Sequence, residues 1–189
     1  MARSLPKLIL FTLFFSLTTF AARSQTSARS LSIEAGPRRS EKLSHLHFYL
    51  HEVFAGPNFT ATQVASAPTT IQSATSFGAV FVIDDMLKLG PDAGSKLVGR
   101  AQGLTSSVSQ AESTLLMAVN FVFAEGKFNG STLSMLGRNS LALEVREMAI
   151  TGGTGAFRLA RGYVRTKTHS IDRTSGLLVS EYDVYVWHY

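Results

Sequence analysis

Residues 44–54 read SHLHFYLHEVF, and apolar residues recur there at every second position. Successive side chains of a β-strand point to opposite faces, so this pattern predicts a strand with one apolar face. Four apolar residues and one acid share that face: Leu46, Phe48, Leu50, Phe54 and Glu52. The strand therefore places a carboxyl group among side chains that are expected to point into a core.

Further short apolar runs extend from this strand to the C-terminus. They are rich in Val, Phe, Tyr, Ile and Thr, and turn signals such as Gly56-Pro57-Asn58 and Glu125-Gly126 separate them. The predicted strands are 44–54, 77–88, 97–107, 114–124, 128–136, 141–150, 156–169 and 177–189. No long segment carries a helical stripe, so we expect an all-β domain, either an eight-stranded antiparallel β-barrel or a sandwich.

The glycine-rich run Gly152-Gly153-Thr154-Gly155 also needs an interpretation. A phosphate-binding loop would require a following Lys-Ser/Thr and a strand-loop-helix setting, and both are missing. We therefore predict a tight turn at this run.

The segment 113–124 reads STLLMAVNFVFA and is apolar on both faces of a predicted strand, apart from Asn120. A barrel wall that faces water alternates apolar and polar residues. We expect a second subunit to cover the outer face, although a sandwich strand or a covering loop would explain the pattern equally well.

The first 24 residues have the pattern of a secretory signal. Arg3 and Lys7 precede the uncharged run Leu8 to Ala22, and small residues follow at Ala22-Arg23-Ser24. About 15 apolar residues are too few to span a ~30 Å hydrocarbon core. We expect a signal peptide at 1–24, a flexible leader at 25–42 and a secreted domain at 43–189, with no membrane span.

Charge and composition exclude several classes of function. Removing the three cations of residues 1–24 lowers the formal net charge from +5 to +2, so the basic pI does not indicate a nucleic-acid surface. The chain has no cysteine, which excludes thiol catalysis and disulfides. Two sequons, Asn58-Phe59-Thr60 and Asn129-Gly130-Ser131, predict glycosylation at Asn58 and Asn129.

A second acid repeats the pattern of the first strand. In residues 77–89 the apolar phase includes Asp85, whereas Asp84 falls on the other face. Burial disfavours the charged form of a carboxyl group, so an inward acid can hold a proton near neutral pH and deliver it to a ligand. Alternatively, Asp85 lies at a strand end and meets solvent or a cation such as Arg100.

Three histidines on one strand face raise the question of a metal site. His45, His47 and His51 are spaced two or four residues apart, and residues two apart on a strand lie about 7 Å apart, too far to share one ion easily. We expect no metal.

Several strings, in order, cover almost all of residues 43–189 and resemble the plant dirigent family. They are His45 to Glu52 (HLHFYLHE), Val82-Ile83-Asp84-Asp85, Val98 to Gly103 (VGRAQG), Gly152 to Arg158 (GGTGAFR) and Ala160-Arg161-Gly162. The resemblance implies an eight-stranded antiparallel barrel that assembles as a homo-oligomer, a dimer or trimer, in the plant apoplast.

The resemblance also implies a function without a cofactor. Dirigent proteins have no oxidative centre: a separate oxidase such as a laccase makes phenoxy radicals, and the dirigent protein makes their coupling stereoselective, as in lignan formation. Related members handle a quinone methide with the help of carboxylates.

The family pattern suggests which residues act. Glu52 stands where the first-strand acid is usually Asp, Arg146 matches the family's Arg, and with Asp85 they form the expected catalytic set. Thr105 and Asn139 stand where lignan-forming members have Tyr and a second catalytic Asp, and with Phe48 they are expected to contact the substrate.

The lignan-forming members' paired cysteines are absent. Gly137-Arg138-Asn139 and the ending Val184 to Tyr189 are more similar to the branch that includes pterocarpan synthases. Three hypotheses follow: a director of radical coupling, a dehydratase or cyclase acting through a quinone methide, and a lipocalin-type binding protein without chemistry.

Overall fold

The structure is a computed structural model and describes residues 40–189, so the predicted signal peptide and most of the predicted leader lie outside the described residues. The described part consists of nine strands and three single-turn 3₁₀ helices. The strands are β1 (Lys42–Val53), β2 (Ala61–Ala65), β3 (Val80–Lys88), β4 (Leu97–Ser107), β5 (Thr114–Phe123), β6 (Thr132–Ser140), β7 (Arg146–Thr154), β8 (Arg161–Asp172) and β9 (Leu177–His188). The 3₁₀ helices are η1 (Thr70–Gln72), η2 (Gly126–Phe128) and η3 (Gly155–Phe157). None of the helices in residues 40–189 has the length and apolar character needed to cross a bilayer.

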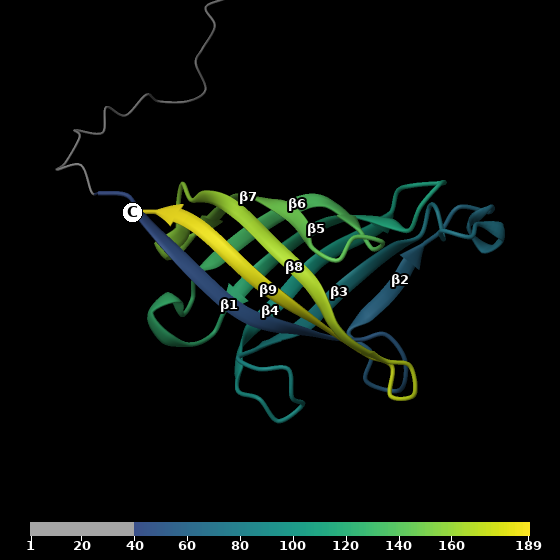
Figure 1. The fold of residues 1–189 in the computed structure, drawn as a ribbon, viewed down its shortest axis with the longest axis horizontal. Helices are drawn as coiled ribbons and strands as arrows, with labels where there is room; N and C mark the ends of the chain where they lie inside the picture. Colours follow the sequence, from purple (N-terminus) through teal and green to yellow (C-terminus); the bar gives the residue numbers. More distant parts are fainter. Residues whose placement is uncertain (1–39) are drawn as a thin grey trace, which may run out of the picture. The chain divides into compact units, whose positions relative to one another are not determined.

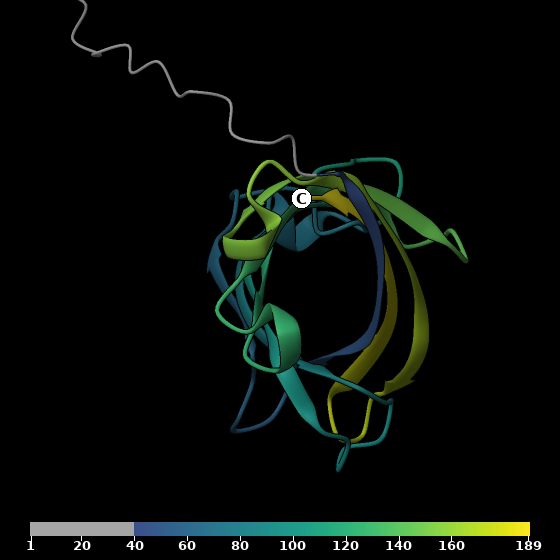
Figure 2. The same cartoon turned by 90° about the vertical axis from the view of Figure 1, so that its left-hand side faces the viewer.

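Eight of the strands form a closed antiparallel barrel. Their order is β1-β9-β8-β7-β6-β5-β4-β3, and β1 closes the ring by pairing with β3, where Leu50 lies opposite Leu87. Figure 1 shows the barrel from the side, and Figure 2 shows the strands as a ring seen from one end. The prediction of an all-β, eight-stranded barrel is confirmed, and the sandwich alternative is wrong.

The ninth strand, β2, was not predicted. It pairs with the N-terminal half of β3, outside the ring, and four of its five residues are exposed. Because the segment buries almost no apolar surface, it has no hydrophobic period from which a strand could be recognised.

Three predicted strands are displaced in the structure. The segment predicted at 156–169 forms β8 at Arg161–Asp172, because Gly155–Phe157 form the turn η3. The segment predicted at 128–136 forms β6 at Thr132–Ser140, because Phe128 belongs to the turn η2. The segment predicted at 141–150 forms β7 at Arg146–Thr154, because residues 141–145 form an exposed loop. In these segments some apolar residues belong to a turn that packs on the core, and others are exposed in a loop. Hydropathy alone does not distinguish such residues from those of a strand.

The predicted turn at Gly152 to Gly155 is also displaced. Gly152 and Gly153 lie within β7 and pair with Ser134 and Leu133 of β6. The turn begins at Gly155, whose φ of +60° favours glycine.

The inside of the barrel has two different halves. Aromatic and aliphatic side chains fill the half near the C-terminal end of β9, where the rings of Phe123 and Phe157 lie 5.7 Å apart and both are buried. The half near the N-terminal end of β9 encloses a cavity instead. The packed core therefore closes the barrel at one end, and the cavity lies at the opposite end.

Candidate functional site

The cavity has a volume of about 410 Å³, which is within the range of small-molecule sites. All nine strands and the adjoining loops contribute to it, β2 through Ala61 alone. Its walls are mostly apolar, with Phe81, Ile83, Leu115, Met117 and Leu178 among them. The polar side chains that line it are Glu52, Asp85, Thr105, Asn139, Arg146, Thr168, Ser180 and Tyr182. An apolar space with a few convergent polar groups is the usual form of a ligand site.

Most of the residues singled out from the sequence meet in this cavity. Five of the six expected catalytic and substrate-contacting residues line it: Glu52, Asp85, Thr105, Asn139 and Arg146. The sixth, Phe48, lies in the core, 2 % exposed, with its ring stacked on Tyr182 at 5.9 Å and edge-on to Phe121 at 5.1 Å. Phe48 shares the inner face of β1 with Glu52 but lies four residues away, on the packed side of the barrel, and it is not among the residues that line the cavity. Its contact with a substrate stays a prediction.

Asp85 is the most deeply buried acid of the site, with no exposed surface. Its Oδ1 accepts a hydrogen bond of 2.5 Å from the hydroxyl of Thr60, while its Oδ2 has no partner within residues 40–189. The pKa of Asp85 is raised to about 8, mainly by burial and also by the charge of Glu52, against the opposing effect of the Thr60 hydrogen bond. Asp85 therefore holds a proton at neutral pH.

Glu52 is the second acid and is only partly buried. Burial raises its pKa above the ordinary value. The β1–β3 ladder ends with His51 opposite Met86, and the next pair in the same register is Glu52 and Asp85. Two carboxyl groups thus face the cavity from neighbouring strands.

Arg146 supplies the positive charge of the site. Its side chain is 5 % exposed, and its Nε donates a hydrogen bond of 3.1 Å to Oδ1 of Asn139. Its Nη1 donates to the Thr168 hydroxyl at 3.2 Å and to the carbonyls of Leu143 and Glu144. All of these partners are neutral, so burial lowers the pKa of Arg146 from its ordinary value.

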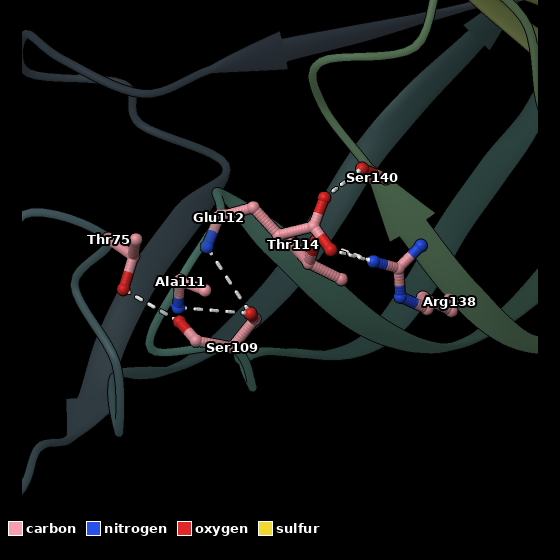
Figure 3. A network of polar contacts seen from close by, with 7 residues as sticks. All are labelled: Thr75, Ser109, Ala111, Glu112, Thr114, Arg138 and Ser140. Atoms are coloured by element: carbon pink, nitrogen blue, oxygen red, sulfur yellow. Dashed lines mark hydrogen bonds and ion pairs between the residues drawn. The ribbon is translucent and has the colours of Figure 1, made fainter.

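The strand end that carries Asn139 is held by an outer acid. Glu112, in the loop between β4 and β5, pairs with Arg138 and accepts a hydrogen bond of 3.1 Å from the Ser140 hydroxyl, as Figure 3 shows. The residues on both sides of Asn139 are therefore tied to one carboxylate, while the Asn139 amide itself points inward and donates to the Met117 sulfur at 3.1 Å. This arrangement orients Asn139 toward Arg146.

Tyr182 lines the cavity but was not singled out from the sequence. It is 3 % exposed, and burial raises its pKa well above the ordinary value of a tyrosine. Its alternation with Val184 and Val186 in β9 gives the inward phase. Alternation shows that Tyr182 points inward, but the sequence does not show how far along the barrel the cavity extends. Tyr182 was therefore not identified as a site residue.

The histidines of β1 do not form one group. His45 and His47 lie outside the barrel, where they contact Asp183 at 2.7 Å and Glu181 at 3.0 Å. His51 is buried under the loop between β3 and β4 and contacts the carbonyl of Gly90 at 3.1 Å.

Ligand atoms of one histidine and two acids do cluster on the outer face: those of His47, Glu181 and Asp183 lie within 4.8 Å of one another. The amine of Lys167 also contacts Glu181, at 3.1 Å, and these contacts form a surface ion-pair network.

Both sequon asparagines are exposed. Asn58 lies in the loop between β1 and β2, and Asn129 follows η2 in the connection between β5 and β6. Both positions are geometrically accessible to a glycan.

The fold and site define a class of protein: a closed antiparallel barrel whose apolar cavity presents a protonated acid, a second carboxyl group and a buried arginine to a small ligand. Comparison with known proteins identifies the family. The sequence profile described as "Dirigent-like protein" matches residues 43–187. The chain is 48% identical over 187 residues to Dirigent protein 21 of Arabidopsis thaliana, covering 98% of this chain and 99% of that protein. It is also 46% identical over 190 residues to Pterocarpan synthase 1 of Glycyrrhiza echinata, covering all of both chains.

A solved structure agrees. The structure of the pterocarpan synthase dirigent protein GePTS1 superposes with a TM-score of 0.74 at 48% identity, covering 82% of this chain and 89% of that one. The chain belongs to the dirigent family.

Proposed function

We propose that this dirigent protein binds a phenolic alcohol in its cavity and converts it, through a quinone methide, into a cyclised product without an oxidant. The observation that carries the proposal is the pair of unlike acids, with Asp85 buried and protonated and Glu52 less buried. Paired carboxyl groups whose environments separate their pKa values are suited to act as acid and base. The 46% identity to a pterocarpan synthase over the whole chain supports the same reaction class.

The proposed reaction moves protons and exchanges one C–O bond for another. Asp85 gives its proton to the benzylic hydroxyl of the substrate, the C–O bond breaks and water leaves, while Glu52 takes the proton of the conjugated phenol. The neutral quinone methide that results is attacked at the benzylic carbon by a second phenol oxygen of the same molecule. The attacking phenol returns its proton to Asp85, and Glu52 returns its proton to the first phenol oxygen. One water is lost in total, and the reaction involves no net oxidation or reduction.

The cavity contributes in two further ways. Its apolar walls exclude water, which would otherwise add to the quinone methide. Its rigid lining restricts the conformation in which the second phenol approaches, and this gives one stereochemical product. Because the hydrogen-bond partners of Arg146 are uncharged, its positive charge is available to stabilise a developing phenolate.

A second candidate is the stereoselective coupling of phenoxy radicals made by a separate oxidase. The 48% identity to a protein named as a dirigent protein supports it, as does a mostly apolar cavity with a few polar groups that could orient phenolic ligands. In this candidate the acids orient the phenolic ligands by hydrogen bonds, and the oxidant is a laccase.

One experiment separates the candidates. The purified protein is incubated with a panel of isoflavanols and with coniferyl alcohol, each with and without laccase, and the products are resolved by chiral chromatography. The proposal predicts a single enantiomer of a dehydrated product from an isoflavanol without laccase. Enantiomeric excess only in the laccase reactions would favour radical coupling, and binding with no change in products would leave a lipocalin-type role.

We also propose that the protein is a secreted homo-oligomer. The pattern at residues 1–24 and the exposed sequons at Asn58 and Asn129 support a glycoprotein of the apoplast. An apolar row on the outer face supports a second copy: Val82, Leu104, Ala118, Leu136 and Ala149 lie side by side across β3 to β7 and are all exposed. Covering such a row with another copy of the same face removes apolar surface from water.

A further inference from the structure

The hydroxyl of Thr60 lies at the junction of the two strands that carry the acids. Thr60 Oγ1 accepts a hydrogen bond of 2.9 Å from the backbone N–H of Val53, next to Glu52 in β1, and donates to Asp85 Oδ1 at 2.5 Å. The Thr60 backbone is held as well: its N–H donates to the Val53 carbonyl and its carbonyl accepts from the Asp84 N–H, both at 2.8 Å. The position of the hydroxyl is therefore determined on every side.

The direction of these hydrogen bonds decides where the acid proton lies. A backbone N–H can only donate, so the Thr60 oxygen must accept from Val53. The oxygen could accept a second hydrogen bond, but within residues 40–189 Asp85 Oδ1 is the acceptor that the hydroxyl hydrogen reaches, so this buried hydrogen is paired only when Oδ1 accepts it. A protonated carboxyl group has one oxygen that carries the hydrogen and one that does not, and Oδ1 is the latter.

We propose that Thr60 is a positioning residue that confines the proton of Asp85 to Oδ2, the oxygen that has no protein partner and is left for a bound ligand. This inference rests on the proposed role of Asp85 as the acid of the site. Without Thr60, the proton could occupy either oxygen and only one of the two forms would be productive. The other charged groups around Asp85 do not take this role: Arg100 is bound to Asp84 through its Nε, and Glu52 is itself a carboxyl group.

Thr60 has a second property that any test must separate from the first. It is the third residue of the sequon Asn58-Phe59-Thr60, so replacing it by a residue other than serine removes the glycan acceptor as well as the hydroxyl. The parent for the experiment is therefore Asn58→Gln, which removes the sequon and keeps the hydroxyl. Thr60→Ser, Thr60→Val and Thr60→Ala are compared in that background.

The direct readout is the infrared C=O stretch of the protonated Asp85 carboxyl group, assigned by its absence in Asp85→Asn and followed as a function of pH without substrate. In the parent and in Thr60→Ser the band has the lowered frequency of a carbonyl that accepts a hydrogen bond. In Thr60→Val and Thr60→Ala the band moves to higher frequency. Its titration midpoint rises by about one to two pH units, because the hydrogen bond that favours the carboxylate is lost.

Activity gives the second readout. Thr60→Ser retains the parent's turnover, whereas Thr60→Val lowers kcat more than it changes KM, because the hydroxyl does not touch the substrate. An Asp85 band that is the same in the parent, Thr60→Val and Thr60→Ala would overturn the inference.

If neither apolar variant folds, the parent band alone decides: the frequency of a carbonyl without a hydrogen bond would overturn the inference, and the lowered frequency would support it. Because the infrared measurement needs no substrate, absence of turnover in every variant would count against the proposed function and leave this result standing.

Discussion

Glu52 and Asp85 are the next pair in the register that joins β1 to β3, and both side chains line the cavity. The two neighbouring strands close the barrel at this point, so barrel closure itself brings the carboxyl groups together. Their environments differ, since Asp85 has no exposed surface and Glu52 is partly exposed. Burial raises the pKa of both acids, and the charge on Glu52 contributes to the pKa of about 8 at Asp85, so Asp85 keeps its proton at neutral pH.

The first prediction concerns the roles of these two acids. Asp85→Asn removes the proton donor with little change in shape, so we expect turnover to fall about 10²- to 10⁴-fold. Asp84→Asn is the matched control, because the same change falls one residue away on the exposed outer face. Product formation is measured by chiral chromatography at saturating substrate. Equal losses in Asp85→Asn and Asp84→Asn would contradict a specific role for Asp85.

The pH dependence of activity follows from the same pair. The protonated form of Asp85 is the active acid, and its pKa is about 8, so kcat is expected to fall as pH rises through about 8. Glu52 acts as the ionised form, so kcat also falls when acidic pH protonates it. Glu52→Gln is expected to remove the acidic limb and to move the basic limb to lower pH, because the charge of Glu52 no longer raises the pKa of Asp85. If Glu52→Gln keeps the acidic limb unchanged, the limb reports the titration of a group other than Glu52.

Stability should depend on pH in a related way. The folded state raises the pKa of Asp85 from an unfolded value of about 4 to about 8, so it binds the proton more tightly than the unfolded chain does. The contribution of Asp85 to the free energy of unfolding is therefore complete below about pH 4 and is lost as pH rises toward 8. Glu52 acts in the same direction.

Urea titrations at several pH values measure this slope. Asp85→Asn is expected to flatten it, whereas Asp84→Asn is expected to keep it, because pairing with Arg100 lowers the pKa of Asp84 and confines its effect to acidic pH. An equally steep slope in Asp85→Asn would show that other groups cause it.

The sequence predicts much of this site because alternation in a strand is a local property. The inward phases of Glu52 and Asp85 follow from period two, and the structure places both at the cavity. Alternation shows which residues point into the barrel but not how far along its axis they lie relative to the cavity. That position depends on where the large side chains of all eight barrel strands fill the interior. For this reason Phe48 was expected at the site and lies in the core, while Tyr182 was not expected and lines the cavity.

Thr60 was missed for a different reason. It lies just before the short strand β2, in a segment with no hydrophobic period, and its sequence context is that of a glycosylation motif. Its hydrogen bond to Asp85 connects residues 25 positions apart through the close approach of β1, β2 and β3. Such a contact depends on tertiary pairing, which one sequence does not reveal.

A further prediction concerns Asn139, which stands where the family resemblance implies an acid. Arg146 has only neutral partners within residues 40–189, so Asn139→Asp introduces a carboxylate beside a buried guanidinium. We expect the free energy of unfolding at pH 7 to rise by about 1–3 kcal/mol, because a hydrogen bond between two charged groups replaces one between a guanidinium and a neutral amide. The nearby cation lowers the pKa of the new acid, so the gain is lost as pH falls through its titration.

The same variant tests the site chemistry. The new carboxylate would be ionised and would neutralise Arg146, so we expect turnover through the quinone methide to decrease rather than increase. Asn139→Leu, which removes the partner of Arg146 without adding charge, serves as the control for loss of the hydrogen bond. Higher turnover in Asn139→Asp than in the wild type would contradict the proposed use of the Arg146 charge.

The last prediction concerns the apolar row on the outer face of the barrel. Leu136 of β6 belongs to the row that we propose another copy covers, and it is 46% exposed. Leu116 of β5 lies beside the row and is 42% exposed. Leu136→Glu places a charge in that row, and burying an unpaired charge at an interface is costly, so the assembly is expected to dissociate to a monomer.

Ile71→Glu makes the same kind of change at a residue that is 89% exposed in η1, outside the row, and is expected to keep the native mass. Light scattering coupled to size exclusion measures both. Because the cavity is lined by nine strands of the same chain, a Leu136→Glu monomer should still bind a phenolic ligand. A wild type that is already monomeric would overturn the proposed assembly.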